Sequence, residues 1–142
     1  MKREQWLKWE PLSGITPTLY LKKLKYEQNI LTLEAQDKPN TNTPIFTIYF
    51  NDFLTARTMF EEDKLSNSYD YDKTIVQRNK QNSPYCNWSL FRVEKSHYIE
   101  WFIQQNVGIN QDISIVHYLI FTLHNLIEVL VPEDSIPTAI WN

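Results

Sequence analysis

Three histidines are the side chains of this sequence best suited to proton transfer, and they lie on different predicted elements. His117 stands within the apolar run IVHYLIF, His97 at the beginning of a predicted helix, and His124 beside Asn125 in a predicted turn. An inward-facing His117 could act as a general base or as a pH-sensitive group. No Ser, Cys or Asp has the sequence context of a nucleophile, so a packed core histidine is the favoured interpretation.

The spacing of the potential ligands argues against metal and nucleotide sites. The histidines form no HxH, HxxxH or HExxH pattern, which two zinc ligands on one element would require. Asp70 and Asp72 begin an alternation typical of calcium loops, but the later glycine and glutamate of an EF-hand are missing. The chain has two glycines, Gly14 and Gly108, which exclude the usual Gly-rich phosphate loops. We therefore expect no metal, no cofactor and no catalytic residue.

A second arrangement could still support chemistry if a helix covers a curved sheet. Arg92 and Glu94 lie on a short predicted strand before the helix, and His117 lies on a later strand. A pocket between helix and sheet could bring these three side chains together for small-ligand binding or hydrolysis. This enzyme-like alternative stays open, although the chain is more typical of a protein without catalysis.

The longest stretch without hydrophobic periodicity is a polar loop at about 61–88. Such long stretches are usually functional or disordered. Tyrosines supply contact area at low rotamer cost, and clustered carboxylates attract a basic partner. A solvated insertion without a binding role is the open alternative. The candidate partner-binding residues are Glu61, Glu62, Asp63, Tyr69, Asp70, Tyr71, Asp72 and Tyr85.

The elements that must position these side chains are mostly strands. Alternating hydrophobic residues predict a hairpin over 19–36, with a turn at 28–29 and a β-bulge near 22–23. The same pattern predicts a second hairpin over 45–60, with its turn at 51–52.

The apolar stretch 113–131 predicts a third, buried hairpin. Its polar residues argue against a membrane span, because each would be costly to bury in hydrocarbon. Ser96 is a predicted N-cap for one helix at about 96–107, and Gly108 a predicted stop. The wide hydrophobic arc of this helix predicts that it lies across the sheet with most of its circumference covered.

The fold class predicted from these elements is α+β. We expect a single domain over 1–142, with one curved, mainly antiparallel sheet of about six to seven strands built from hairpins and one principal helix packed on it. A chain of 142 residues is long enough to bury one core.

Composition and charge limit the possible partners and the compartment. The net charge of −3 and the absence of a long basic run argue against nucleic acid as a partner. The single cysteine suits a reducing compartment, and the N-terminal sequence has no signal-peptide core. We expect a cytoplasmic protein without membrane contact.

Three segments carry a family resemblance: TARTMFEED, WSLFRVEKSHYIEWFIQQNVG and IVHYLIFTLHNLIEVLVP. Together they resemble small stand-alone bacterial proteins of uncharacterised or toxin-immunity type, mainly over 55–132. The resemblance implies an immunity protein that binds and neutralises one cognate toxin, and the acidic charge would suit a basic toxin domain. The sequence leaves monomer and homodimer open, since a flat edge strand at 45–50 could pair with a second copy.

Overall fold

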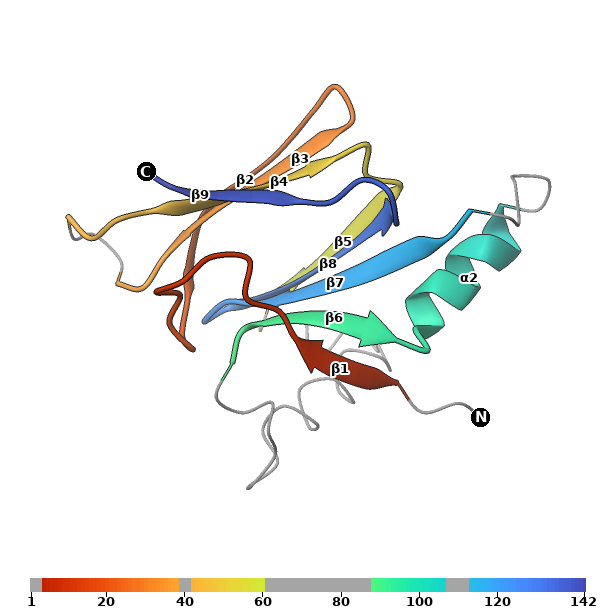
Figure 1. Ribbon diagram of the computed structural model, residues 1–142, viewed down its shortest axis with the longest axis horizontal. Helices are drawn as coiled ribbons and strands as arrows, with labels where there is room; N and C mark the ends of the chain where they lie inside the picture. The colour runs from red at the N-terminus through yellow and green to blue at the C-terminus, as the bar shows by residue number, and fades with distance from the viewer. Residues whose placement is uncertain (1–3, 39–41, 61–87, 107–112) are drawn as a thin grey trace.

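The computed structural model describes residues 4–38, 42–60, 88–106 and 113–142 (Figure 1). Within these ranges the chain forms nine strands and one helix, arranged as two antiparallel sheets of five and four strands. The predicted α+β class agrees with these elements, but the predicted single curved sheet is wrong. The predicted polar loop lies almost entirely outside the described residues.

The five-stranded sheet contains the most apolar part of the chain. Its β7–β8 pair is the predicted hairpin within 113–131, closed by a hydrogen bond from the N–H of Thr122 to the carbonyl of Asn125 at 2.9 Å. The strands follow one another across the sheet in the order β1 (Gln5–Lys8), β6 (Leu90–Glu94), β7 (Ile115–Phe121), β8 (Asn125–Pro132) and β5 (Thr55–Phe60).

The four-stranded sheet begins with the predicted hairpin over 19–36. Gln28 and Asn29 have φ angles of 49° and 66°, the left-handed conformation that a tight two-residue hairpin turn requires. The register shifts between Leu21 and Lys23, which confirms the predicted β-bulge. The order of its strands is β2 (Tyr20–Glu27), β3 (Ile30–Gln36), β4 (Phe46–Asn51) and β9 (Thr138–Trp141).

The predicted hairpin over 45–60 is not formed. β4 pairs with β3 and β9, whereas β5 pairs with β8 in the other sheet. Asp52, with a φ of 54°, turns the chain between the two sheets, and the N–H of Leu54 then donates to the carbonyl of Leu130 at 2.8 Å. β4 is also an inner strand and not the predicted edge strand. Alternation predicts which face of a strand is buried, but not which strand lies beside it.

The main hydrophobic core lies between the two sheets, which Figure 1 shows as separate layers. The ring of Phe50 on β4 lies 5.7 Å from that of Tyr118 on β7, and the ring of Trp9 lies 4.5 Å from Tyr118. Residues of both sheets are fully buried here, among them Leu31, Leu33, Phe46, Ile48, Phe50, Ile120, Ile127 and Val129.

The five-stranded sheet is buried on its other face as well. Trp6, Phe91 and Phe121 come from three different parts of the chain, and their ring centroids lie 5.6 to 6.1 Å apart. In the sequence of a strand that is buried on both faces, nearly every residue is hydrophobic. This burial explains why β7 and β8 together resemble a membrane span in sequence.

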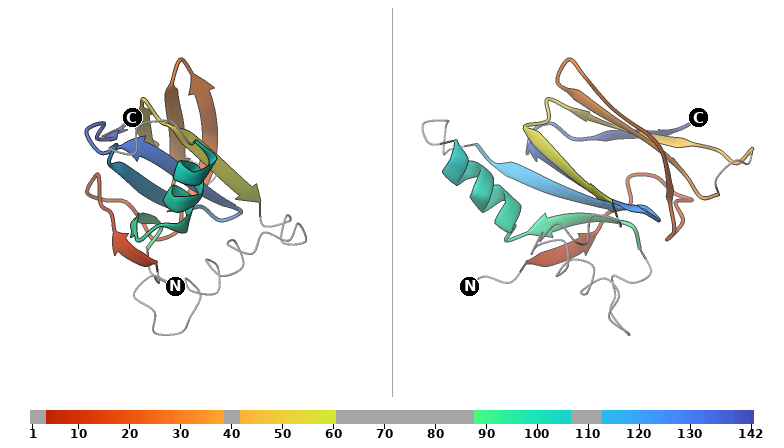
Figure 2. Two further views of the ribbon diagram at one scale, coloured as in Figure 1. Left: turned by 90° about the vertical axis from the view of Figure 1, so that its right-hand side faces the viewer. Right: turned by 180° about the vertical axis from the view of Figure 1, so that it is seen from behind.

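Helix α2 (His97–Gln105) lies at one end of this sheet, next to β7 (Figure 2). The Ser96 side chain caps its N-terminus as predicted, and accepts a hydrogen bond from the N–H of Ile99 at 3.0 Å. Tyr98 is the buried residue of the helix, whereas Trp101 is 50% exposed. Among the described residues, the helix therefore lacks the expected cover over most of its circumference.

Within the described ranges, no helix combines the length and the apolar character needed to cross a membrane.

Candidate functional site

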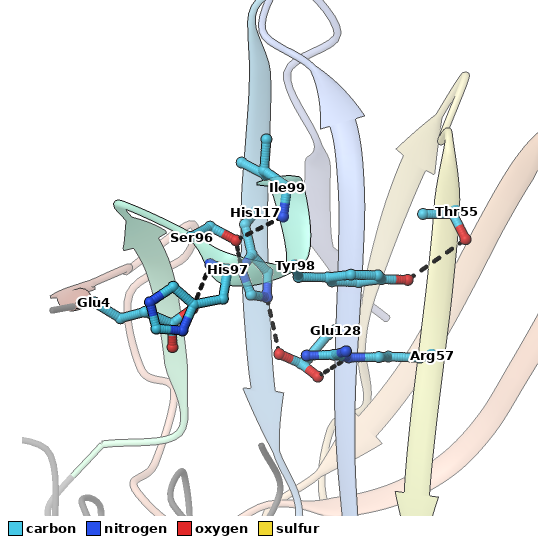
Figure 3. A network of polar contacts seen from close by, with 9 residues as sticks. All are labelled: Glu4, Thr55, Arg57, Ser96, His97, Tyr98, Ile99, His117 and Glu128. Atoms are coloured by element: carbon cyan, nitrogen blue, oxygen red, sulfur yellow. Dashed lines mark hydrogen bonds and ion pairs between the residues drawn. The ribbon is translucent and has the colours of Figure 1, made fainter. Parts of the chain in front are cut away.

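A cluster of buried polar side chains joins helix α2 to three strands of the five-stranded sheet (Figure 3). The buried polar cluster consists of Arg57 on β5, Ser96 at the cap of α2, Tyr98 on α2, His117 on β7 and Glu128 on β8. His117 is 1% exposed, Ser96 4% and Glu128 5%. Buried charged and polar groups must find partners, because isolation from water is costly.

The register of the strands places this cluster on one face of the sheet. Glu128 lies opposite Leu119 on β7 and opposite Arg57 on β5. Because side chains alternate along a strand, His117, two residues before Leu119, shares its face. Figure 3 shows Tyr98 reaching from the helix over the same face.

A continuous chain of hydrogen bonds runs through the cluster. Ser96 Oγ lies 2.7 Å from His117 Nδ1, and His117 Nε2 lies 3.0 Å from Glu128 Oε1. The guanidinium Nε–H of Arg57 donates to the second carboxylate oxygen of Glu128.

The chemical types of the hydrogen-bonding partners indicate which nitrogen of His117 carries a proton. An ionised carboxylate only accepts, so Nε2 of His117 carries a proton and donates it to Glu128. Ser96 Oγ forms the hydrogen bond to Nδ1 of His117, and the same oxygen accepts from the N–H of Ile99. Each of these groups thus has a hydrogen-bonding partner.

The charge state of Glu128 follows from two opposing effects. Burial alone would raise the pKa of its carboxyl, but the hydrogen bonds and charges of His117 and Arg57 outweigh burial and lower the pKa to about 2. Glu128 is therefore ionised at neutral pH and forms an ion pair with Arg57, whose side chain is partly buried.

Tyr98 closes the cluster on the helix side. Its ring stands edge-on to the imidazole of His117 at 5.5 Å, and the guanidinium carbon of Arg57 lies 4.0 Å from the ring centre. The phenol lies 3.4 Å from Thr55 Oγ1. Burial raises the pKa of Tyr98, so its phenol stays neutral.

The Ser96–His117–Glu128 order suggests a hydrolytic triad, but the serine is not placed to attack a substrate. A nucleophilic oxygen must be able to reach a reacting carbonyl. Ser96 is nearly fully buried, and its oxygen accepts the N–H of Ile99 as the helix cap. The arrangement ties α2 to the sheet and offers no open reaction centre.

The structure does not bring the three residues of the predicted pocket together. Val93 is the β6 residue opposite His117, whereas Arg92 lies opposite Tyr118 and therefore on the other face. Glu94 shares the face of Arg92, and both side chains are exposed. Only the packed interpretation of His117 fits this geometry.

The remaining candidate residues lie elsewhere. His124 is exposed in the β7–β8 turn, and the backbone N–H of His97 donates to Glu4 Oε2 at 2.9 Å. The predicted partner-binding residues lie outside the described residues, so their role stays a prediction: Glu61, Glu62, Asp63, Tyr69, Asp70, Tyr71, Asp72 and Tyr85. In the ranges that the structure does describe, no three His, Cys, Asp or Glu side chains gather as metal ligands would.

Described residues line at least two hollows on the surface. The α2 hollow, of about 360 Å³, lies between the helix and strand β5 and is lined by Thr55, Ala56, Arg57, His97, Tyr98 and Trp101. The β9 groove, of about 410 Å³, is more apolar and is lined by Gly14, Thr16, Leu19, Asp37, Pro44, Phe46, Trp141 and Asn142. Both volumes fall in the range of ligand pockets, roughly 300 to 1,000 Å³.

Trp141 is held firmly at the β9 groove although 41% of it is exposed. Its indole N–H donates to the carbonyl of Ser13 at 3.0 Å, and its ring meets Phe46 edge-on at 5.6 Å. Gly14, with a φ of 85°, lies against the indole, since a Cβ there would be 3.7 Å from Trp141 Cζ2. The ring is therefore oriented before any ligand arrives.

Comparisons of the chain with models of protein families, with curated proteins and with solved structures gave no match.

Sequence reasoning missed the buried polar cluster as a unit. Ser96 was expected as a helix cap, and His117 as a packed residue, but their contact was not expected. One signal was present: Glu128 is the only formally charged residue within 113–131. A single carboxylate in a buried hairpin needs a cation from another element, and Arg57 supplies it.

Proposed function

We propose that the protein is a non-catalytic protein-binding module of the toxin-immunity type, which binds and neutralises a cognate bacterial toxin. The observation that carries the proposal is the exposure of large hydrophobic side chains at and just before strand β9. Ile136 is 75% exposed, Ile140 45% and Trp141 41%. Neighbouring exposed hydrophobic side chains are typical of surfaces that another protein covers.

The position of β9 suits such a contact. Among the described strands, β9 has one neighbour, β4, and so forms an edge of the four-stranded sheet. An edge strand can pair with a strand of a partner, while its side chains supply specificity. Tryptophan is among the residues that contribute most to binding energy at interfaces.

The charge of the chain favours a basic partner. A net charge of −3 attracts a basic toxin domain at long range and speeds encounter. The acidic side chains among the partner-binding residues predicted within 61–85 would add to this attraction. The closed polar cluster supports binding over catalysis, since its serine and histidine are buried.

The proposal is tested by mixing the protein with the product of a toxin gene adjacent to its own gene. Size-exclusion chromatography should show a complex, and calorimetry should give its Kd. The variant Ile140→Asp should weaken binding about tenfold or more, because it puts a charge where an apolar contact is expected. Leu123→Asp, at an equally exposed hydrophobic residue in the β7–β8 turn, is the matched control.

Two results would count against the proposal. One is the absence of a complex at micromolar concentrations of both proteins. The other is equal loss of binding in Ile140→Asp and Leu123→Asp, which would indicate a general effect of added charge. Thermal unfolding of each variant shows whether β9 still forms.

The α2 hollow supports a second candidate function, the binding of a small ligand. The rings of Tyr98 and Trp101 lie 5.9 Å apart, and Arg57 lies against the first of them. This hollow lies between helix and sheet, where the sequence predicted a pocket, although different residues line it. An NMR screen with a small-molecule library should shift the indole signal of Trp101, and Trp101→Ala should abolish binding in a folded protein. A screen without hits at Trp101 would contradict this candidate.

A further inference from the structure

We propose that the β9 groove receives an arginine side chain of the protein partner. This inference rests on the proposed function, because it specifies the chemistry of the partner at the same edge strand, β9. The side chains that line the groove are mainly apolar or aromatic, and Asp37 is the one acidic or basic side chain among its described lining residues. A ligand for this groove must therefore combine an apolar stem with a positive charge.

The walls of the groove favour a guanidinium over an ammonium. Phe46 and Trp141 offer aromatic surface, and Leu19 and Pro44 add aliphatic surface. A guanidinium is flat and weakly hydrated, and so stacks on aromatic rings at a smaller desolvation cost than a lysine ammonium. Its paired N–H groups also match the two oxygens of a carboxylate such as Asp37.

The charges around the groove exclude the opposite ligand. Asp37 would repel a carboxylate or phosphate group, and no described lining residue supplies a compensating cation. A neutral apolar side chain would leave the carboxylate of Asp37 without a charged partner. The net charge of −3 also favours a positively charged ligand, because it attracts a basic protein.

The groove needs little rearrangement to bind. The bond from the Trp141 indole to Ser13 and the edge contact with Phe46 fix the ring that would stack on the guanidinium. Asn142 is also held, because its N–H donates to the carbonyl of Ile45 at 2.7 Å and its side chain donates to Thr47 Oγ1 at 2.6 Å. Such preorganisation lowers the entropy cost of binding.

The first test uses two matched probes with the isolated protein. N-acetyl-arginine methylamide carries the guanidinium, and N-acetyl-citrulline methylamide has a neutral urea of nearly the same shape. In ¹H–¹⁵N spectra the arginine probe should shift the Trp141 indole signal, with a Kd on the order of millimolar as expected for one side chain. The citrulline probe should cause no comparable shift. Trp141→Phe assigns the indole signal by its disappearance.

The second test uses the variant Asp37→Asn. The substitution removes one charge at a partly exposed position and should leave the fold intact, while the arginine probe binds roughly fivefold more weakly. Equal shifts from the two probes, no shift of Trp141 by the arginine probe, or unchanged binding in Asp37→Asn would each overturn the inference.

The protein partner separates this inference from the proposed function. If Ile140→Asp loses the partner while Asp37→Asn binds it with full affinity, the binding function stands and the arginine contact is wrong. If the arginine probe binds at Trp141 but no toxin forms a complex, the groove chemistry stands and the proposed function fails.

Discussion

Nε2 of His117 lies 3.0 Å from Oε1 of Glu128, and both side chains are buried on the face of the five-stranded sheet that contacts helix α2. The two residues lie on the two strands of one hairpin. His117 also contacts Ser96, the cap of helix α2, and Glu128 also contacts Arg57 on strand β5, which is distant in sequence. This contact therefore connects local structure to the packing of the whole five-stranded sheet. Its energetic role can be tested without knowledge of any ligand.

Replacing Glu128 by glutamine should destabilise the fold by about 3 kcal/mol, because the change removes the buried negative charge that binds both Arg57 and His117. Chemical denaturation measures this loss directly. Glu133→Gln, at an exposed carboxylate close by in the chain, is the matched control and should change stability by less than about 0.5 kcal/mol. Equal stability of Glu128→Gln and the wild type would contradict the ion pair.

Stability should fall in acid because of Glu128. Its folded-state pKa of about 2 is below the ordinary value of 4.5, so ionisation stabilises the folded state at pH values above 4.5. This contribution, on the order of 3 kcal/mol, should be lost progressively as the pH falls from about 4.5 to about 2. Urea unfolding between pH 6 and pH 2.5 checks it. The slope should be markedly smaller in Glu128→Gln, and an identical slope would show that other carboxylates cause the effect.

Ser96→Ala should loosen helix α2. The change removes the hydrogen bonds of Ser96 with the N–H of Ile99 and with His117 Nδ1, at a cost of about 1–2 kcal/mol. Hydrogen exchange at the amides of the first turn should become faster than in the wild type. Ser114→Ala, at an exposed serine before β7, should leave these rates unchanged. Unchanged exchange in Ser96→Ala would rule out its role as the helix cap.

Gly14→Ala should lower stability by roughly 1 kcal/mol, because alanine rarely adopts the φ of 85° found there. The space beside Trp141 accommodates the added Cβ at 3.7 Å, so the cost comes from the backbone conformation. Thermal unfolding measures the change. A stability equal to that of the wild type would indicate that the turn at Gly14 relaxes easily.

The sequence predicted local features of the fold better than distant ones. The 19–36 hairpin and its bulge follow from neighbouring residues: Gln28 and Asn29 permit the turn, and the phase of the leucines requires the bulge. The 45–60 hairpin failed because β4 pairs with the preceding strand β3 and with β9, and β5 pairs with β8; β8 and β9 are remote in the chain. Periodicity contains no information about such pairing.

In the candidate site too, the sequence predicts burial but not contacts between distant segments. The burial of His117 could be expected from its apolar neighbours, but its contact with Ser96 depends on how α2 packs against β7. The β9 groove joins Gly14 to Trp141, near opposite ends of the chain, and no sequence pattern connects them. Sites assembled from distant segments require the three-dimensional structure.

The central claim is that the protein binds and neutralises a toxin through its edge strand β9, and growth of a bacterium that expresses the toxin tests it most directly. Co-expression of the wild-type protein should restore growth, Leu123→Asp should restore it equally, and Ile140→Asp should restore it poorly despite normal folding. Undiminished toxicity in the presence of abundant, folded wild-type protein would contradict the claim.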